Sequence, residues 1–410
     1  MSSLNLSTNK PLLPAAYVAL AAALLIELAP IEVRAEDNTV PLVMEIFIAD
    51  KYPIPQFQAN LNWPQLPAGT LLGQVSGLAV DSDDTIWILQ RPNSVSAEDL
   101  AAAAEARGGD RCQTAPHVLQ FKQTGELLRG WGGEALAPIL DGINQWPANV
   151  HGLFVDGDGV WLAGNGGDDH VVLNFSKTGK FRQQYGRRGA SGGNSDPELL
   201  GNPADIFHDP ASGQLAIADG YINRRVIQFD NRAHRFDQLW GAYGRPPAGV
   251  RAGQFDVSQA VSEERGNPES ASFGDIMHCV NRASDGLLYV CDRRNNRVQI
   301  FKADSAGRMQ FVANLAVSPD SRGPGSATDV AFSPDERYLY IADMANGKIW
   351  IYWRENLELL AAIGGNGRAP GEFTWLHSVA TDSSGNLYTS EVSRGRRAQK
   401  LVLLGFSAPL

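Results

Sequence analysis

The stretch Val150-His151-Gly152-Leu153-Phe154-Val155-Asp156 opens one unit of a repeat that runs through the chain. Its apolar residues, followed by an Asp-Gly turn, predict a short β-strand that leads into a hairpin. Related stretches at residues 277–280 and 376–382 place His278 and His377 where this unit has His151. Sister stretches without this histidine lie at residues 76–81, 204–209 and 328–333. Histidine therefore falls on every second unit.

Each unit continues in a similar way after its first strand. A turn rich in Asp, Ser and Gly leads to a second strand, and most units add a third strand ending in an aromatic residue and a fourth ending in Gly. Six units of four short antiparallel strands predict an all-β fold, a six-bladed β-propeller. The last unit ends before its fourth strand. We therefore expect an N-terminal strand near residues 57–61 to close the propeller and remove the free sheet edge.

The chain divides into three predicted parts. Residues 1–35 contain Lys10, an apolar run over residues 12–30 and the sequence Val33-Arg34-Ala35, a pattern typical of a signal peptide cleaved after Ala35. An uncleaved N-terminal anchor is the alternative, because the run is nearly long enough to span a bilayer. Residues 36–75 form an N-terminal segment with the closing strand, and residues 76–410 form the propeller. We expect an exported protein, periplasmic or secreted.

The overall charge is acidic. The formal net charge is −10, from 35 basic and 45 acidic side chains. Phosphate binding needs a basic face, so this charge argues against a nucleic-acid partner. We expect a soluble monomer that contacts a membrane only through its N-terminal segment.

The cysteines allow one disulfide at most. Their number is odd, at Cys112, Cys279 and Cys291, which excludes a fully paired framework. Cys279 and Cys291 fall on two strands of one predicted hairpin, where they either pair or remain two buried thiols.

Two units carry insertions. The first contains an Ala-rich stretch over residues 97–106, which predicts a short surface helix. The third contains a polar stretch rich in Pro and Gly over residues 246–272, which predicts a long loop on one face. Loops of this length often line or cover a site.

The three repeated histidines form a candidate metal site. The innermost strand of each propeller blade runs along the central channel, so His151, His278 and His377 should converge from blades two, four and six. Three neutral imidazoles with room for a fourth ligand are a catalytic zinc arrangement. The alternative is three unrelated core histidines. The other histidines fall at different registers: His117, His170, His208 and His234.

A second pattern connects the chain to a known family. Turns that begin at Asp219, Asp292 and Asp343 share an Asn, a basic residue and then a β-branched residue. This pattern resembles the NHL repeat, although Asp and Asn at these places also simply fix a turn. Together with the three histidines, the chain resembles the peptidyl-α-hydroxyglycine α-amidating lyases, the lyase domain of peptidylglycine α-amidating enzymes. Members of that family are six-bladed propellers with a three-histidine zinc site.

The resemblance assigns further residues to the site. Tyr221 matches the catalytic tyrosine of the family, and Arg91 and Arg293 match its two active-site arginines. The implied reaction cleaves the C–N bond of a peptide or small-molecule carbinolamide, R-CO-NH-CH(OH)-COO⁻, to an amide and glyoxylate. Zinc would acidify the hydroxyl group, Tyr221 would act as the base, and the arginines would hold the carboxylate.

The chain departs from the family near the third histidine. Trp375 stands where the family has methionine, which predicts a flatter, more occluded substrate pocket. Ser378 stands where the family has an aspartate that helps to hold a structural calcium, together with carbonyl oxygens that match those of Leu78 and Leu153. Calcium therefore lacks one expected ligand. No copper hydroxylase domain precedes the propeller, so we expect the substrate to come from another source or to be a different carbinolamide.

Two other readings remain open. NHL propellers also serve as non-catalytic scaffolds for protein or ligand binding, in which a metal would only staple the channel. A calcium-dependent hydrolase on a similar propeller would need carboxylates where the inner strands supply histidine. Tyr221 and the two arginines in register with the histidines favour the lyase.

Overall fold

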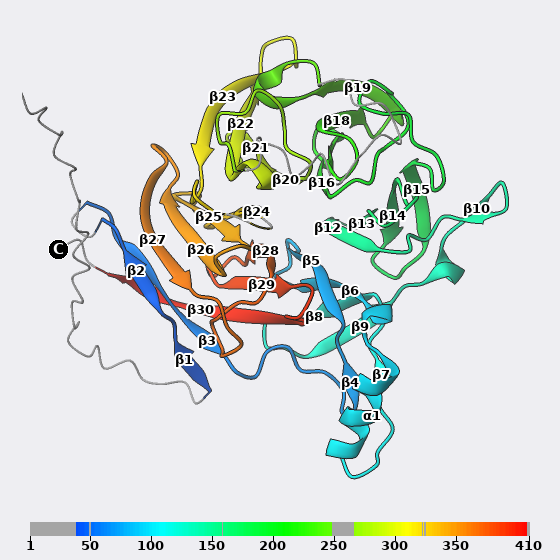
Figure 1. Ribbon diagram of the computed structural model, residues 1–410, viewed down its shortest axis with the longest axis vertical. Helices are drawn as coiled ribbons and strands as arrows, with labels where there is room; N and C mark the ends of the chain where they lie inside the picture. Colours follow the sequence, from blue (N-terminus) through cyan, green and yellow to red (C-terminus); the bar gives the residue numbers. More distant parts are fainter. Residues whose placement is uncertain are drawn as a thin grey trace, which may run out of the picture. The chain divides into compact units, whose positions relative to one another are not determined.

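The computed structural model describes residues 38–48, 51–157, 159–247, 266–321, 323 and 325–407. In this part of the chain, six antiparallel sheets radiate around a central axis, so the predicted six-bladed propeller is confirmed (Figure 1). The predicted leader at residues 1–35 and most of the predicted loop at residues 246–272 lie outside the described residues.

The first three blades have four strands each, ordered from the axis outward. Blade one contains β5 (Gln74–Val80), β6 (Ile86–Arg91), β8 (Val118–Phe121) and β9 (Leu127–Trp131). Blade two contains β12 (Val150–Asp156), β13 (Gly159–Gly164), β14 (Val171–Ser176) and β15 (Phe181–Gly186). Blade three contains β16 (Asp205–Asp209), β17 (Gln214–Asp219), β18 (Arg225–Asp230) and β19 (Arg235–Trp240).

The last three blades follow the same order, and two of them take up strands from the N-terminal segment. Blade four contains β20 (Met277–Arg282), β21 (Leu288–Asp292), β22 (Arg297–Ala303) and β23 (Met309–Ala316). Blade five contains β24 (Ala327–Phe332), β25 (Tyr338–Asp343), β26 (Lys348–Trp353), β27 (Glu358–Gly364) and β2 (Met44–Ile46). Blade six contains β28 (Leu376–Thr381), β29 (Leu387–Glu391), β30 (Arg397–Ser407), β3 (Ile54–Asn60) and β1 (Thr39–Pro41).

An N-terminal strand closes the ring, as expected. β3 pairs antiparallel with β30, from Ile54 opposite Ser407 to Asn60 opposite Lys400. It begins a few residues before the predicted stretch at 57–61. The outer strands β1 and β2 were not assigned to blades from the sequence; they cover the edges of blades six and five. This pairing joins the N-terminal segment and the C-terminal strand of the described chain in one sheet, that of blade six.

Adjacent blades pack face to face through apolar side chains. Trp87 and Leu89 of blade one, for example, are buried against Val160 and Leu162 of blade two. Alternate residues of each strand point to opposite faces of its sheet, so every blade contributes to two such cores. The inner strands are held in this way on both sides, which fixes the residues that face the axis.

Smaller elements complete the described chain. The predicted surface helix is α1 (Ala97–Ala106), which begins with a capping box between Ser96 and Asp99. Short pairs and 3-10 helices occupy connections: β4 (Thr70–Leu71), β7 (Gln113–Thr114), β10 (Ile139–Leu140), β11 (Ile143–Asn144), η1 (Pro92–Ser94), η2 (Glu134–Leu136), η3 (Ala242–Gly244) and η5 (Arg293–Asn295). No helix among the described residues is both long enough and apolar enough to cross a membrane.

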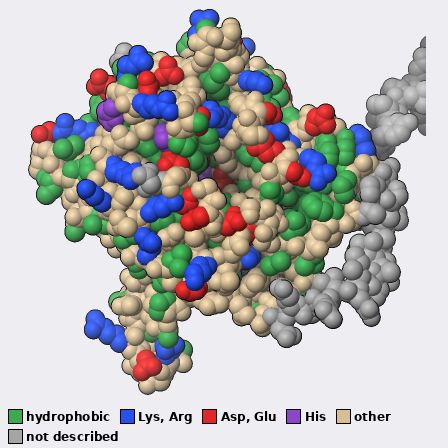
Figure 2. Space-filling view, turned by 180° about the vertical axis from the view of Figure 1, so that it is seen from behind, with side chains coloured by type: hydrophobic (Ala, Val, Ile, Leu, Met, Phe, Trp, Pro, Cys, Tyr) green, Lys and Arg blue, Asp and Glu red, His purple; other side chains and the backbone are tan. Residues whose placement is uncertain are grey.

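The open question about the cysteines is resolved. Cys279 of β20 and Cys291 of β21 form a disulfide between neighbouring strands of blade four. Cys112 is a buried free thiol. On the face shown in Figure 2, basic and acidic side chains are interspersed.

Candidate functional site

The three repeated histidines meet at the axis. Each is the second residue of an inner strand: His151 of β12, His278 of β20 and His377 of β28. The strand pairing is irregular at each of these places, a bulge that re-aims the side chain. One ring nitrogen from each lies within 4.8 Å of the other two, and all three side chains are buried. The predicted convergence of the three histidines is present in this structure.

Backbone carbonyls orient two of the three rings. The Nδ1 atom of His151 lies 2.7 Å from the carbonyl oxygen of Ala204, and Nδ1 of His278 lies 2.7 Å from that of Thr328. A carbonyl only accepts, so each Nδ1 donates and each Nε2 presents a lone pair. The Nε2 atoms of His278 and His377 are 3.2 Å apart. This is the tautomer and orientation that ligation through Nε2 requires.

The site keeps the histidines neutral. Burial lowers the pKa of His151 and His278 well below the usual value of 6.5, and the positive charges of Arg91 and Arg293 lower both further. Burial also lowers the pKa of His377, and the two other histidines and the same arginines add to this effect. Neutral imidazoles are the form that binds a metal ion.

Tyr221 lies against this cluster. It follows β17, and its hydroxyl oxygen is 2.8 Å from Nε2 of His151. The tyrosine ring also lies edge-on to the His151 ring, at 4.9 Å between centroids. Its phenol group therefore shares the space into which the three ring nitrogens point.

Both predicted arginines approach the same region. Arg91, the last residue of β6, donates from Nε to the carbonyl oxygen of Val150 at 2.9 Å and from Nη1 to Oε1 of Gln74 at 2.9 Å. Burial lowers its pKa, and the nearby phenol of Tyr221 opposes that shift. Arg293 begins η5 just after β21, is 5% exposed, and places Nη1 3.6 Å from Sδ of Met344. Gln74 and Met344 are contacts that the sequence did not reveal.

Trp375 lies at the start of the third histidine strand, two residues before His377. Its side chain is 41% exposed, its backbone has φ of +59°, and its carbonyl oxygen accepts a hydrogen bond from the N–H of Val392. The positive φ places the backbone of Trp375 in the left-handed region at the tight entry into β28.

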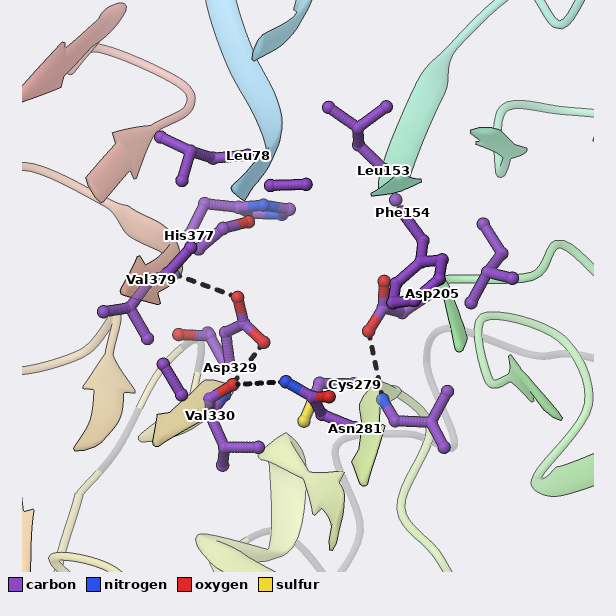
Figure 3. Close-up of a pocket in the computed structure, with 18 of the residues that line it drawn as sticks. Leu78, Leu153, Phe154, Asp205, Cys279, Asn281, Asp329, Val330, His377 and Val379 are labelled. Carbon is purple, nitrogen blue, oxygen red and sulfur yellow. Dashed lines mark hydrogen bonds between the residues drawn. The ribbon is translucent and has the colours of Figure 1, made fainter. Parts of the chain in front are cut away.

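Beyond the histidines, the inner strands enclose a cavity of about 260 Å³. Its lining includes Leu78 and Leu153, the two residues whose carbonyls were expected to reach calcium. It also includes two carboxylates that the sequence analysis did not select, Asp205 and Asp329 (Figure 3). They follow Ala204 and Thr328 in the sister units without histidine, so their matching positions were a usable signal.

Comparison with known proteins supports the repeat assignment. The NHL repeat model matches residues 278–301, within blade four. The chain carries an NHL repeat. The NHL repeat-containing protein 3 of Mus musculus is 26% identical over 301 residues, which cover 71% of this chain and 67% of that protein.

Proteins named for peptide alpha-amidation also appear among the relatives. Peptidyl-glycine alpha-amidating monooxygenase B of Xenopus laevis is 28% identical over 267 residues, covering 63% of this chain and 26% of that protein. A probable peptidyl-alpha-hydroxyglycine alpha-amidating lyase of Caenorhabditis elegans is 25% identical over 274 residues, covering 66% of each. The resemblance of this NHL-repeat chain to amidating lyases is therefore confirmed at the level of distant homology. The chain matches about a quarter of the length of the Xenopus protein.

Proposed function

We propose that this NHL propeller is a zinc-dependent lyase that cleaves the C–N bond of a carbinolamide to an amide and glyoxylate. The observation that carries the proposal is the placement of Tyr221 against His151, with the charges of Arg91 and Arg293 acting on the same histidines. A phenol, two guanidinium groups and three neutral imidazoles at one point are the parts that this reaction needs.

The donor set fits a zinc ion. His151, His278 and His377 are neutral and buried, and their ring nitrogens are close enough to share one ion. Three histidines leave a fourth position for water or substrate, as in catalytic zinc sites. Zinc bound there would polarise the hydroxyl oxygen of the substrate and ease its deprotonation.

The protein groups have separate roles in the proposed reaction. Tyr221 would accept the hydroxyl proton, since its oxygen lies 2.8 Å from Nε2 of His151, one of the nitrogens that would bind the metal. Arg91 and Arg293 would hold the carboxylate of the substrate by forked hydrogen bonds. When the C–N bond breaks, its electron pair goes to nitrogen, which takes a proton and leaves as the amide. The remaining carbon keeps its oxygen and becomes the aldehyde of glyoxylate.

The proposed enzyme would act outside the cytoplasm. Export would bring the enzyme to peptide or small-molecule carbinolamides outside the cytoplasm, and the disulfide of blade four is of a kind that persists in such compartments. Trp375 would narrow the entrance and select slender substrates. Calcium at the carbonyls of Leu78 and Leu153 would have no carboxylate from blade six, because position 378 is serine.

A non-catalytic scaffold is the second candidate. It is favoured by the NHL repeat-containing protein 3 relatives, whose identity to this chain is similar to that of the amidating proteins. A scaffold would use its loops to bind a protein or ligand, and a metal ion held by the three histidines would only link the blades around the channel. It gives no reason for a phenol and two arginines around that cluster.

Glyoxylate release from α-hydroxyhippurate by the purified protein, with and without a chelator, tests the proposal. We expect release that the chelator stops and that zinc restores. Tyr221→Phe should lower kcat by about 100-fold or more while zinc stays bound, as for loss of a general base. Tyr52→Phe is the matched control, because the hydroxyl of Tyr52 accepts a hydrogen bond from Asn356, between β26 and β27, and Tyr52 is not one of the proposed site residues. A zinc-loaded protein without activity on this and related carbinolamides would favour the scaffold.

A further inference from the structure

Gln74 supports the guanidinium group of Arg91. These two residues lie directly opposite each other on neighbouring strands of blade one, at the start of β5 and the end of β6. Nη1 of Arg91 donates to Oε1 of Gln74 at 2.9 Å, and Nε donates to the carbonyl oxygen of Val150 at 2.9 Å. Val150 precedes His151, so the same arginine also contacts the strand of the first histidine.

The backbone around this pair is fixed as well. The N–H of Gln74 donates to Oγ of Ser94 at 2.7 Å, and Oγ of Ser94 donates to the carbonyl oxygen of Arg91 at 2.7 Å. The two strands approach so closely at the preceding residue, Gly73, that a Cβ there would overlap the carbonyl oxygen of Arg91. The amide of Gln74 therefore acts from a fixed place on the guanidinium group.

The two contacts of the side chain decide which donors of Arg91 remain for a ligand. A guanidinium group carries five N–H donors. Among the described residues, the carbonyl of Val150 takes the donor on Nε, and Gln74 takes one of the two on Nη1. A forked contact to a carboxylate needs two parallel N–H groups. The end of the guanidinium formed by Nη1 and Nη2 is the part that such a ligand can use.

The supports of Arg91 leave its charge intact. Both oxygens that accept its hydrogen bonds among the described residues are uncharged, one from an amide and one from a peptide carbonyl. The charge of Arg91 acts on the whole histidine cluster, since it lowers the pKa of His151, His278 and His377. A carboxylate at position 74 would orient the guanidinium equally well but would form an ion pair with it. The amide orients the group and keeps its charge for an anion.

We propose that Gln74 is a positioning residue that makes the site select carboxylate-bearing substrates, by directing the Nη1 and Nη2 end of Arg91 toward the histidine site while leaving its charge to the substrate. Gln74 does not contact the substrate in this proposal and acts only through Arg91. The inference rests on the proposed function, which assigns Arg91 to the carboxylate of the carbinolamide. It adds the residue on which that assignment depends.

Hippurate binding to the full-length chain tests the proposal without a reaction, since hippurate has the carboxylate of α-hydroxyhippurate but no hydroxyl group. Isothermal calorimetry should show that Gln74→Glu weakens binding by roughly 10- to 100-fold, because the new carboxylate competes for the guanidinium group. Gln74→Leu should weaken it by about 10-fold, because Arg91 loses an orienting acceptor. Gln113→Glu adds the same charge at an exposed residue of the blade-one insertion and should bind as the wild type does.

A merely structural role of Gln74 predicts a different pattern. Glutamate keeps the length of the side chain and an acceptor oxygen, so Gln74→Glu would bind hippurate normally if Gln74 only held the two strands together. Hippuramide, which lacks the charge, provides a second readout: positioning lowers the preference for hippurate over hippuramide, whereas loss of structure weakens both. In the lyase assay, positioning raises KM for α-hydroxyhippurate and largely keeps kcat.

The outcomes separate this inference from the proposed reaction. Hippurate binding that Gln74→Glu weakens supports the inference even if no glyoxylate is released, a result that would remove the lyase alone. Glyoxylate release with the same KM in the wild type and in Gln74→Glu would overturn the inference and keep the lyase. The inference is also overturned if the wild type does not bind hippurate at roughly 1 mM, the upper end of ordinary KM values.

Discussion

Reduction of the Cys279–Cys291 disulfide should destabilise the propeller by a calculable amount. The two cysteines are 12 residues apart, and both are buried. A cross-link that closes a loop of this size lowers the conformational entropy of the unfolded chain. By the chain-entropy relation, this stabilises the folded state by about 3 kcal/mol. With about 2.1 cal/mol/K of unfolding entropy per residue, a chain of 410 residues should then lose roughly 3–4 °C in Tm.

Blade six supplies the matched variant for this experiment. Ser378 and Ser390 form the cross-strand pair there that Cys279 and Cys291 form in blade four, each just after the irregular pairing at the histidine. A Cys279→Ser, Cys291→Ser double variant therefore introduces a pair that this fold already contains. Thermal unfolding with and without dithiothreitol should show the shift in the wild type and none in the double variant. If the wild type melts at one temperature in both conditions although a thiol assay confirms reduction, the cross-link does not stabilise the fold.

Three further predictions concern the site. His278→Ala should abolish stoichiometric zinc, measured by metal analysis, and full retention would exclude a three-histidine site. Without metal, the free energy of unfolding should fall below about pH 6.5: the folded-state pKa values of the histidines are lowered, so the unfolded chain binds more protons there. The slope should reach roughly 1.4 kcal/mol per pH unit for each histidine, and denaturant titrations with a flat profile from pH 7 to 5 would contradict this. Trp375→Met should widen the range of accepted substrates, seen as higher kcat/KM for bulky carbinolamides; unchanged selectivity would remove Trp375 from the pocket.

The repeat made the fold predictable from the sequence. Six copies of one strand-and-turn pattern gave six independent indications of the same blade, and the incomplete last copy predicted the closing strand. The outer strands β1 and β2 were harder to place. They are three residues each, and which blade takes them up depends on contacts across the whole chain. Short edge strands have too little pattern of their own to show their partners.

The convergence of the three histidines was predictable because the repeat fixed their register. Equivalent inner-strand positions of a closed propeller lie around the central axis, so the repeat predicted that the three histidines would lie close together. Asp205 and Asp329 occupy matching positions too, yet an aspartate at a strand start is also common turn chemistry, so they did not stand out. Gln74 and Met344 contact the arginines only through tertiary structure. The disulfide could not be predicted from the sequence, because two neighbouring strands can carry Cys279 and Cys291 either as a disulfide or as two free thiols.

Blades three and five, which lack the repeated histidine, form hydrogen bonds that position the histidine strands of both neighbouring blades. In blade three, the carbonyl of Ala204 orients the ring of His151 in blade two, and the carboxylate of Asp205 holds the strand after His278 in blade four. Blade five repeats this with Thr328 and Asp329, which act on blades four and six. Each such blade thus supplies one carbonyl and one carboxylate to its two neighbours.

Blade one breaks this pattern. Its matching residue is Gly77, which has no carboxylate, and a Cβ there would lie 2.6 Å from Cβ of Leu153, so packing excludes a larger side chain. The Nδ1 atom of His377, which the carbonyl before Gly77 would orient, has no hydrogen-bond partner among the described residues. The third support is therefore missing on the blade that supplies Arg91, and the three histidines are held unequally by their neighbouring blades.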